Sequence, residues 1–246
     1  MRMNAQCLFI CSVLIVVVWL KTSCTMRQVE KTTVSIPYPQ PVPDSVALDF
    51  LPGIVSTDKR DFGAAFSPDG KSFYFSRSEK SKSHIYVSHH DGKNWTLPAL
   101  VSFNSAAYAE ADPAFGLDGK LYFISDRPSQ PSDTILDYDI WFVSPRAEGV
   151  WSEPENMEAV NSDSAEFYIS FSQNGNLYFA SAREGGFGAE DIYVSQFTNN
   201  HYSTPENLGA AVNSEKSEYD PFISVQEDFI IFTSSNREDT FGGGDL

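Results

Sequence analysis

Acidic residues and arginines recur along this chain at intervals that could bring them to one surface. Four acidic residues each begin a similar stretch of sequence, and each stretch also contains an arginine. The acidic residues are Asp61, Glu110, Glu166 and Glu218, and the arginines are Arg77, Arg127, Arg183 and Arg237. Carboxylate and guanidinium groups can hydrogen-bond a charged or hydroxyl-bearing ligand, and they can also pair with each other. A repeated acid and arginine are more often a structural ion pair, so both roles stay open here.

Two of these acids have a second carboxylate two positions later. Asp112 follows Glu110 in this way, and Asp220 follows Glu218. Calcium takes oxygen ligands, so close carboxylates of this kind could hold it. Neither pair has the spacing of an EF-hand loop, and we therefore expect no metal site and no cofactor.

The motifs of common hydrolases and nucleotide-binding enzymes are absent from the sequence. There is no G-x-S-x-G elbow, no H-E-x-x-H zinc site and no complete G-x-x-x-x-G-K-[ST] phosphate loop. The segment from Ser88 to Trp95 is similar to the Asp-box of sialidase-like proteins, but His90 stands in place of the aspartate, and that motif is structural where it occurs. The sequence therefore predicts a protein that is not an enzyme, with a sialidase-like, glycan-active protein as the alternative.

The chain is strongly acidic, which excludes several classes of partner. Its 246 residues include 17 Lys and Arg against 33 Asp and Glu, a formal net charge of −16. Such a chain is repelled by nucleic-acid phosphates and by anionic lipids, so we expect no nucleic-acid partner. The cysteines, Cys7, Cys11 and Cys24, all precede the repeated stretches, which excludes a disulfide framework or a multi-cysteine zinc site there.

The four stretches are copies of one unit, because their acidic residues are 49, 56 and 52 residues apart. Each unit begins with a strand-like segment that ends in a turn, and three of the turns contain Asp-Gly or Asn-Gly, which suit a tight hairpin. An aromatic and β-branched second strand follows, then a polar segment and a third strand. Three units end with an aromatic residue and a proline, which we place on outer strands that pack between units. The aromatic residues are Trp95, Trp151 and Tyr202.

Four short strands in each unit predict an all-β fold of four-stranded antiparallel blades, arranged as a β-propeller. The fourth unit stops within its third strand, near Asp245. We therefore expect a longer product with five or more blades, and we expect this chain alone to dimerise or aggregate through its uncovered blades. Asp139, Asp191 and Asp245 recur at the start of the third strands, where a carboxylate can cap loop amides.

The topology of an up-and-down blade predicts where a ligand would bind. The acidic residues, the arginines and the long segments 127–138 and 183–190 fall on the same face. Long loops on a rigid scaffold commonly carry binding residues, so this loop face is the predicted binding surface. The candidate residues are Glu110, Asp112, Arg127, Glu166, Arg183, Glu218, Asp220 and Arg237.

The segment before the units predicts export. Residues 1–24 contain Arg2 and a 14-residue apolar run from Cys7 to Leu20, which is typical of a signal peptide. Cys24 follows a serine, a combination similar to a bacterial lipoprotein signal in which that cysteine is lipidated. Residues 25–49 contain prolines at alternate positions and predict a stiff, extended tether. The partial propeller is placed at 50–246.

Several segments are similar to a known family: FSPDGKSFYFSR, LYFISDRP, LYFASAREGGFGAEDIYVS and WSEPENMEAVNS. They resemble the TolB-type, WD-repeat-like propeller repeats of bacterial cell-envelope proteins. The resemblance implies a non-catalytic binding or scaffolding module of the periplasm or outer membrane, which touches the membrane only through an N-terminal lipid anchor. It also implies an envelope protein, or alternatively a carbohydrate, as the ligand. Some propellers of this type accompany a hydrolase domain, so an accessory propeller whose catalytic domain lies outside this chain is a further alternative.

Overall fold

The computed structural model describes residues 37–38, 44–134, 136–147, 149–237 and 242–246. The predicted signal peptide, Cys24 and most of the predicted tether lie outside the described residues. Every regular element in the described part is a β-strand. None of the described residues belongs to a helix long and apolar enough to cross a membrane.

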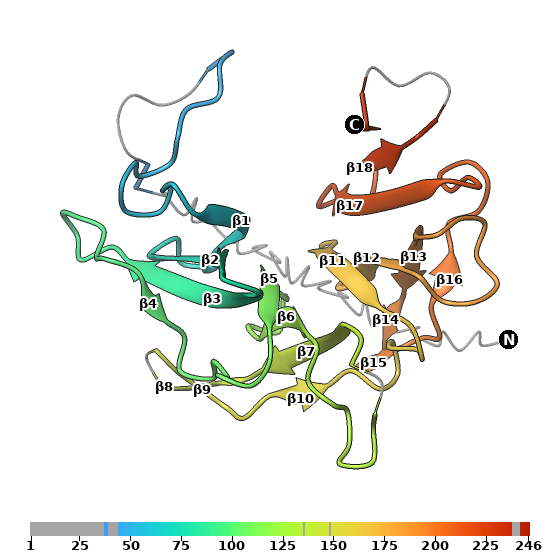
Figure 1. Cartoon of the computed structure of the whole chain (residues 1–246), viewed down its shortest axis with the longest axis horizontal. Coiled ribbons are helices and arrows are strands. Elements are labelled where there is room, and N and C mark those ends of the chain that lie inside the picture. The colour runs from blue at the N-terminus through green and yellow to red at the C-terminus, as the bar shows by residue number, and fades with distance from the viewer. Residues whose placement is uncertain (1–36, 39–43, 135, 148, 238–241) are drawn as a thin grey trace, which may run out of the picture. The chain divides into compact units, whose positions relative to one another are not determined.

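Four antiparallel sheets follow one another along the chain as the blades of a β-propeller, as predicted (Figure 1). The first contains β1 (Arg60–Phe66), β2 (Ser72–Glu79), β3 (Lys82–His89) and β4 (Ala99–Leu100). The second contains β5 (Glu110–Phe115), β6 (Leu121–Ser125), β7 (Asp139–Val143) and β10 (Glu155–Asn156). The third contains β11 (Glu166–Phe171), β12 (Leu177–Ser181), β13 (Asp191–Ser195) and β16 (Glu206–Asn207). The fourth contains β17 (Ser217–Ile223), β18 (Ile230–Ser235) and β19 (Gly244–Asp245).

The turns between first and second strands have the backbone that the sequence predicts. Gly70, Gly119 and Gly175 adopt φ values of 70°, 76° and 85°, which the missing Cβ of glycine allows. In the fourth sheet Glu227 takes this position with φ of 60°. The hairpin register therefore follows from the turn residues in three sheets and is retained without glycine in the fourth.

Two small hairpins lie between the third and fourth strands, and they correct one prediction. β8 (Pro145–Ala147) pairs with β9 (Val150–Trp151), and β14 (Phe197–Thr198) pairs with β15 (His201–Tyr202). Trp151 and Tyr202 therefore lie in these hairpins and not on the outer strands β10 and β16, because the chain makes an extra turn before it reaches the sheet edge. They still pack between sheets: the Trp151 ring centroid is 6.3 Å from that of Tyr74 in the first sheet.

The hydrophobic core lies between neighbouring sheets. Tyr74 and Ile85 of the first sheet pack with Leu121 and Phe123 of the second, and all four are nearly inaccessible to solvent. A second cluster joins the second and third sheets in the same way. Each sheet therefore depends on its neighbour for burial of one face.

The segment before β1 covers the first sheet and makes the same contacts as a connection between blades. Leu51 and Val55 pack on Phe73 and Phe75. Arg77 donates a hydrogen bond of 3.1 Å to the carbonyl of Val55, as the third and fourth arginines do to Val160 and Val212. Part of the predicted tether also contacts this region, since the Trp95 indole donates to the carbonyl of Pro37 at 3.1 Å.

Candidate functional site

Six of the eight predicted binding residues form buried ion pairs. Arg127, Arg183 and Arg237 approach the carboxylates of Glu110, Glu166 and Glu218 at 2.6, 2.9 and 2.9 Å, and all three glutamates are fully buried. Asp61 and Arg77 make the same pair in the first sheet at 2.5 Å. The structural pairing that the sequence left open is therefore present in every sheet.

The environment of these glutamates explains why the pairs repeat. Glu166 also accepts hydrogen bonds from the hydroxyls of Ser162 and Ser181 at 2.6 and 2.8 Å. Burial raises the pKa of Glu166 above its ordinary value, because the charged form loses water. A buried carboxylate with several donors ties the connection between sheets to the strands, and it is not placed to contact a ligand.

The other two predicted residues, Asp112 and Asp220, have a different orientation from the glutamates before them. A β-bulge interrupts each innermost strand, β1, β5, β11 and β17. A bulge adds a residue to one strand and redirects its side chain. Glu110 therefore enters its ion pair, whereas Asp112 lines a cavity on the propeller axis. The two carboxylates of each closely spaced acidic pair, Glu110 with Asp112 and Glu218 with Asp220, therefore point in different directions.

The bulge residues occupy equivalent positions in the four innermost strands. They are Gly63, Asp112, Tyr168 and Asp220, with φ values of 49°, 51°, 56° and 52°. A left-handed backbone is costly for residues with a side chain, by about 1–3 kcal/mol each, and such strain is common at functional sites. Pro113 and Pro221 follow the two aspartates and restrict their backbone further.

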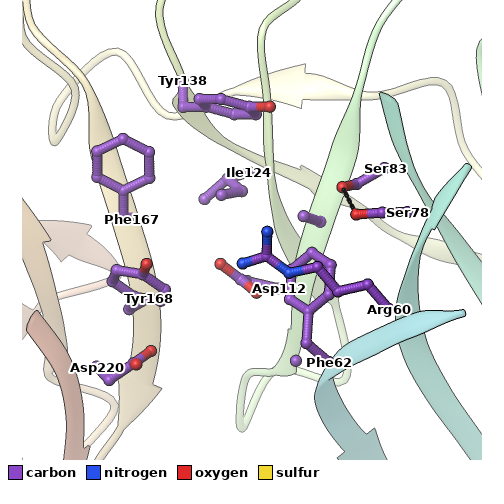
Figure 2. Close-up of a pocket in the computed structure, with 12 residues that line it drawn as sticks. Arg60, Phe62, Ser78, Ser83, Asp112, Ile124, Tyr138, Phe167, Tyr168 and Asp220 are labelled. Carbon is purple, nitrogen blue, oxygen red and sulfur yellow. Dashed lines mark hydrogen bonds between the residues drawn. The ribbon is translucent and has the colours of Figure 1, made fainter. Parts of the chain in front are cut away.

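These residues surround a pocket of about 450 Å³ on the axis, here called the axial pocket. Figure 2 shows the carboxyl groups of Asp112 and Asp220 and the hydroxyl of Tyr168 directed into it, with the Arg60 side chain beside Asp112. The remaining side chains that define the pocket are mainly aromatic or small. They include Phe62, Ser78, Ser83, Ile124, Tyr138 and Phe167.

The axial pocket lies on the predicted loop face. Ser78 and Ser83 lie in β2 and β3, beside the turn that joins these strands, and Tyr138 ends the long segment before β7. A narrower cavity of about 150 Å³ is lined by the same bulge residues. The bulge residues therefore line both cavities, and the wider one, the axial pocket, is on the side of the long loops.

The axial pocket stabilises uncharged carboxyl groups. Burial, and then repulsion by Asp220, raise the pKa of Asp112 to about 7, although the nearby Arg60 opposes the shift. Burial also raises the pKa of Asp220. Burial and the charges of Asp220 and Asp112 raise the pKa of Tyr168 to about 12, so this tyrosine stays neutral at physiological pH.

Gly63 is required where the first sheet meets the second. A Cβ on this residue would lie 2.4 Å from Oδ1 of Asp112, closer than any ordinary contact. The absence of a side chain in β1 therefore leaves the space that the Asp112 carboxyl group occupies.

Other predicted features are found in structural roles. Asp191 accepts hydrogen bonds from the backbone amides of Phe187 and Gly188, the loop cap that the sequence predicts. Asp139 instead accepts a hydrogen bond from Asn156 at 2.8 Å. Within the described ranges no group of three or more histidine, cysteine or acidic side chains could hold a metal ion.

Sequence reasoning missed Arg60, Tyr168 and the aromatic walls of the axial pocket. Arg60 directly precedes the first acidic residue, and Tyr168 is two residues after Glu166. The signal was the alignment of the units, because Tyr168 is at the same offset as Asp112 and Asp220. An offset alone did not indicate a bulge, and without the bulge this position has no reason to face the axis.

Comparisons with known proteins support the fold. No known protein family matches the sequence, and no curated protein matches it. Among solved structures, TolB from Acinetobacter baumannii has a TM-score of 0.51 at 16% identity, over 76% of this chain and 40% of that chain. A puromycin hydrolase has a TM-score of 0.47 at 11% identity, over 72% of this chain and 25% of that chain.

A PQQ-bound aldose sugar dehydrogenase from Streptomyces coelicolor has a TM-score of 0.43 at 14% identity, over 78% of this chain and 80% of that chain. The chain thus spans less than half the length of TolB and of the hydrolase. At 16% identity the likeness to TolB is one of fold, that of the β-propeller.

Proposed function

We propose that this chain is a non-catalytic binding module of the bacterial cell envelope, which recognises a protein ligand at the axial pocket. The observation that carries the proposal is the set of strained bulges that direct Asp112, Tyr168 and Asp220 toward one cavity. Strain of this kind persists only where surrounding structure holds it, and it is frequent in ligand sites. The propeller supplies the rigid scaffold, and the loop face supplies access.

The charge of the axial pocket favours a positively charged group on the ligand. Asp112 and Asp220 repel each other, and Arg60 is the single cationic side chain among the described residues that line the pocket. A lysine or arginine of the ligand would relieve this repulsion, and the rings of Phe62, Phe167 and Tyr168 would attract the cation further. The net charge of −16 would also steer a basic segment toward the protein.

Binding to short peptides tests this proposal. A lysine-rich peptide should bind the whole chain in calorimetry, and a glutamate-rich peptide of the same length should not. The double variant Asp112→Asn with Asp220→Asn should lower the affinity at least about tenfold, because two attractive charges are lost. Affinity should increase as the pH rises through about 7, since Asp112 then ionises. Equal binding of both peptides, or unchanged binding by the double variant, contradicts the proposal.

A matched control separates the pocket from the general charge of the protein. Asp163 is an exposed acid in the loop before β11, and it does not line the pocket. Asp163→Asn removes one carboxylate without touching the axis, so it should leave peptide affinity nearly unchanged. A loss as large as that of Asp112→Asn would mean that only the overall charge matters.

Glycan turnover in the same pocket is the second candidate function. It is favoured by the raised pKa of Asp112, because a carboxyl group that titrates near 7 suits a general acid. Hydrolysis of chromogenic glycosides by the protein, abolished in Asp112→Asn, would support this function. Peptide binding without turnover would support the binding module.

An envelope location is part of the proposal and rests on the N-terminal sequence. The apolar run before Lys21 and the serine before Cys24 favour export and lipidation. Mass spectrometry of the mature protein should find acyl chains on Cys24, and Cys24→Ala should release the protein from membranes. An unmodified N-terminus in the membrane fraction would contradict lipidation.

A further inference from the structure

A second concave surface lies between the second and third sheets, away from the axial pocket. We call it the side groove, and it encloses about 580 Å³. It is bounded by the turn before β6, the outer strand β10 with the residues after it, and the β14–β15 hairpin. Its lining residues are Asp118, Lys120, Tyr122, Phe142, Asn156, Met157, Glu158, Ala159, Phe197, Asn200, His201 and Tyr202.

Aromatic rings form the inner wall of the side groove, and their polar ends are directed toward other groups of the protein. The Tyr122 hydroxyl donates to Asp118 at 3.0 Å, and the hydroxyl of Tyr202 lies near that of Tyr122. The rings of Phe197 and Tyr202 pack at 4.9 Å between centroids. The wall therefore presents carbon surface to a ligand, and its hydroxyl groups do not need a hydrogen-bond partner from that ligand.

Polar side chains without partners stand on the rim. Within the part of the chain that the structure describes, no hydrogen bond or ion pair involves the side chains of Glu158, Asn200 or His201, and all three are exposed. A carboxylate, an amide and an imidazole together can accept and donate hydrogen bonds. Asp118 and Lys120 form a local ion pair at 3.3 Å, so Glu158 is the one acidic side chain among the described residues of the groove whose charge is not compensated by a neighbour.

This combination suits a neutral saccharide. A sugar ring has apolar C–H faces, which pack on aromatic carbon, and hydroxyls that both donate and accept hydrogen bonds. Ligand sites in general combine an apolar wall with a few placed polar groups. A highly charged ligand would find only one uncompensated charge among the lining residues that the structure describes, that of Glu158, because Asp118 and Lys120 neutralise each other.

The propeller repeats this arrangement between the first and second sheets. There, Tyr74, Phe115 and Trp151 line a groove of about 450 Å³, together with Asp69 and Arg146. Tyr74 corresponds to Tyr122 in the aligned units, and Trp151 corresponds to Tyr202. Two such grooves on one propeller could hold two stretches of one polysaccharide and increase its apparent affinity.

We propose that the side groove binds a neutral oligosaccharide, with the sugar faces on Tyr202 and Phe197 and the hydroxyls on Glu158, Asn200 and His201. This site is independent of the axial pocket, because the two share no lining residue. A negative result for one proposal therefore does not contradict the other.

Calorimetric titration of the whole chain with chitotetraose, cellotetraose and maltotetraose tests the inference. At least one should bind, and the double variant Glu158→Ala with His201→Ala should weaken that binding about tenfold or more, through loss of hydrogen bonds. Tyr202→Phe should keep the affinity, because it retains the ring and loses only a hydroxyl that faces Tyr122. These substitutions are conservative or exposed, so thermal melting should confirm an intact fold.

Glu155→Ala is the matched control, because Glu155 is an exposed acid of β10 that does not line the groove. It should leave saccharide affinity unchanged. Absence of binding by all three saccharides at millimolar concentration would overturn the proposal. Binding that survives the Glu158 and His201 double variant, or that Asp112→Asn abolishes, would also overturn it, because the sugar would then lie elsewhere.

Discussion

Neutralising one functional carboxyl group should stabilise this protein, and the effect should depend on pH. Asp112 is confined on the propeller axis by the bulge in β5, and its carboxyl group faces Asp220. In the unfolded chain the same group is hydrated and ionises at its ordinary pKa of 3.8, whereas in the fold its pKa rises to about 7. The folded state therefore binds the proton more tightly than the unfolded state does.

The sign and size of the effect follow from this difference. A raised pKa in the folded state contributes stability below about pH 4, and that contribution is lost as the pH rises to about 7. A rise from 3.8 to about 7 corresponds to about 4 kcal/mol at the limit. The opposing effect of Arg60 is already included in this pKa. Because Asp112 is only partly buried, solvent screens part of the cost, and we expect about 2–4 kcal/mol above pH 7.

Asp112→Asn is the appropriate perturbation, because asparagine has nearly the same shape and tolerates the left-handed backbone at this position. Urea unfolding of both proteins should give similar free energies of unfolding at pH 4. At pH 8 the variant should be more stable than the natural chain by about 2–4 kcal/mol. Asp163→Asn, an exposed control, should change stability little at either pH.

Two results would refute this reasoning. The first is a variant that is less stable than the natural chain at pH 8, which would mean that the carboxylate makes a favourable interaction in the folded state. The second is a difference in stability that does not change with pH. Stabilisation combined with loss of peptide binding would mean that the site is retained at a cost in stability.

The other predictions concern the framework and the edge of the propeller. Arg183→Met should lower the free energy of unfolding in urea by about 3–5 kcal/mol, because Glu166 would be left buried without its cation, and a loss below about 1 kcal/mol would contradict this. Gly63→Ala should cost about 1–3 kcal/mol by calorimetry, since its Cβ would collide with Asp112 in a left-handed backbone, and an unchanged melting temperature would exclude the collision. Phe222 and Ile231 are 53% and 44% exposed on the fourth sheet, so changing both to serine should reduce self-association in sedimentation, and equal association would place the contact elsewhere.

The repeated units were sufficient to predict the blades. The Asp-Gly turns, the aromatic second strands and the spacing of the acidic residues are local features, and hairpin geometry depends on residues close in sequence. The ion pair of Glu166 with Arg183 could also be predicted from the sequence, because an acid and an arginine recur at these places in every unit. Repetition makes such contacts predictable, because the same pair of residue types recurs in every unit.

The hairpins β8–β9 and β14–β15 were not predicted. Trp151 and Tyr202 are close in sequence to the outer strands, and sequence order alone did not distinguish a strand from the turn before it. Residues 50–57 were also not predicted to act as a connection between blades. The segment is too short to recognise from sequence, and its role became clear only from the hydrogen bond that Arg77 donates to the carbonyl of Val55.

The axial pocket was decided by the tertiary structure. Alternation along a strand assigns residues to two faces of a sheet, but a bulge breaks the alternation and depends on how neighbouring strands register. Glu110 and Asp112 should share a face by simple alternation, yet one is buried in an ion pair and the other lines the axis. The sequence by itself determined the repeat, the strands and the paired charges, because those follow from local chemistry and period. Only the packing of four inner strands around one axis decided which side chains converge there, because Arg60, Asp112, Tyr168 and Asp220 come from different blades.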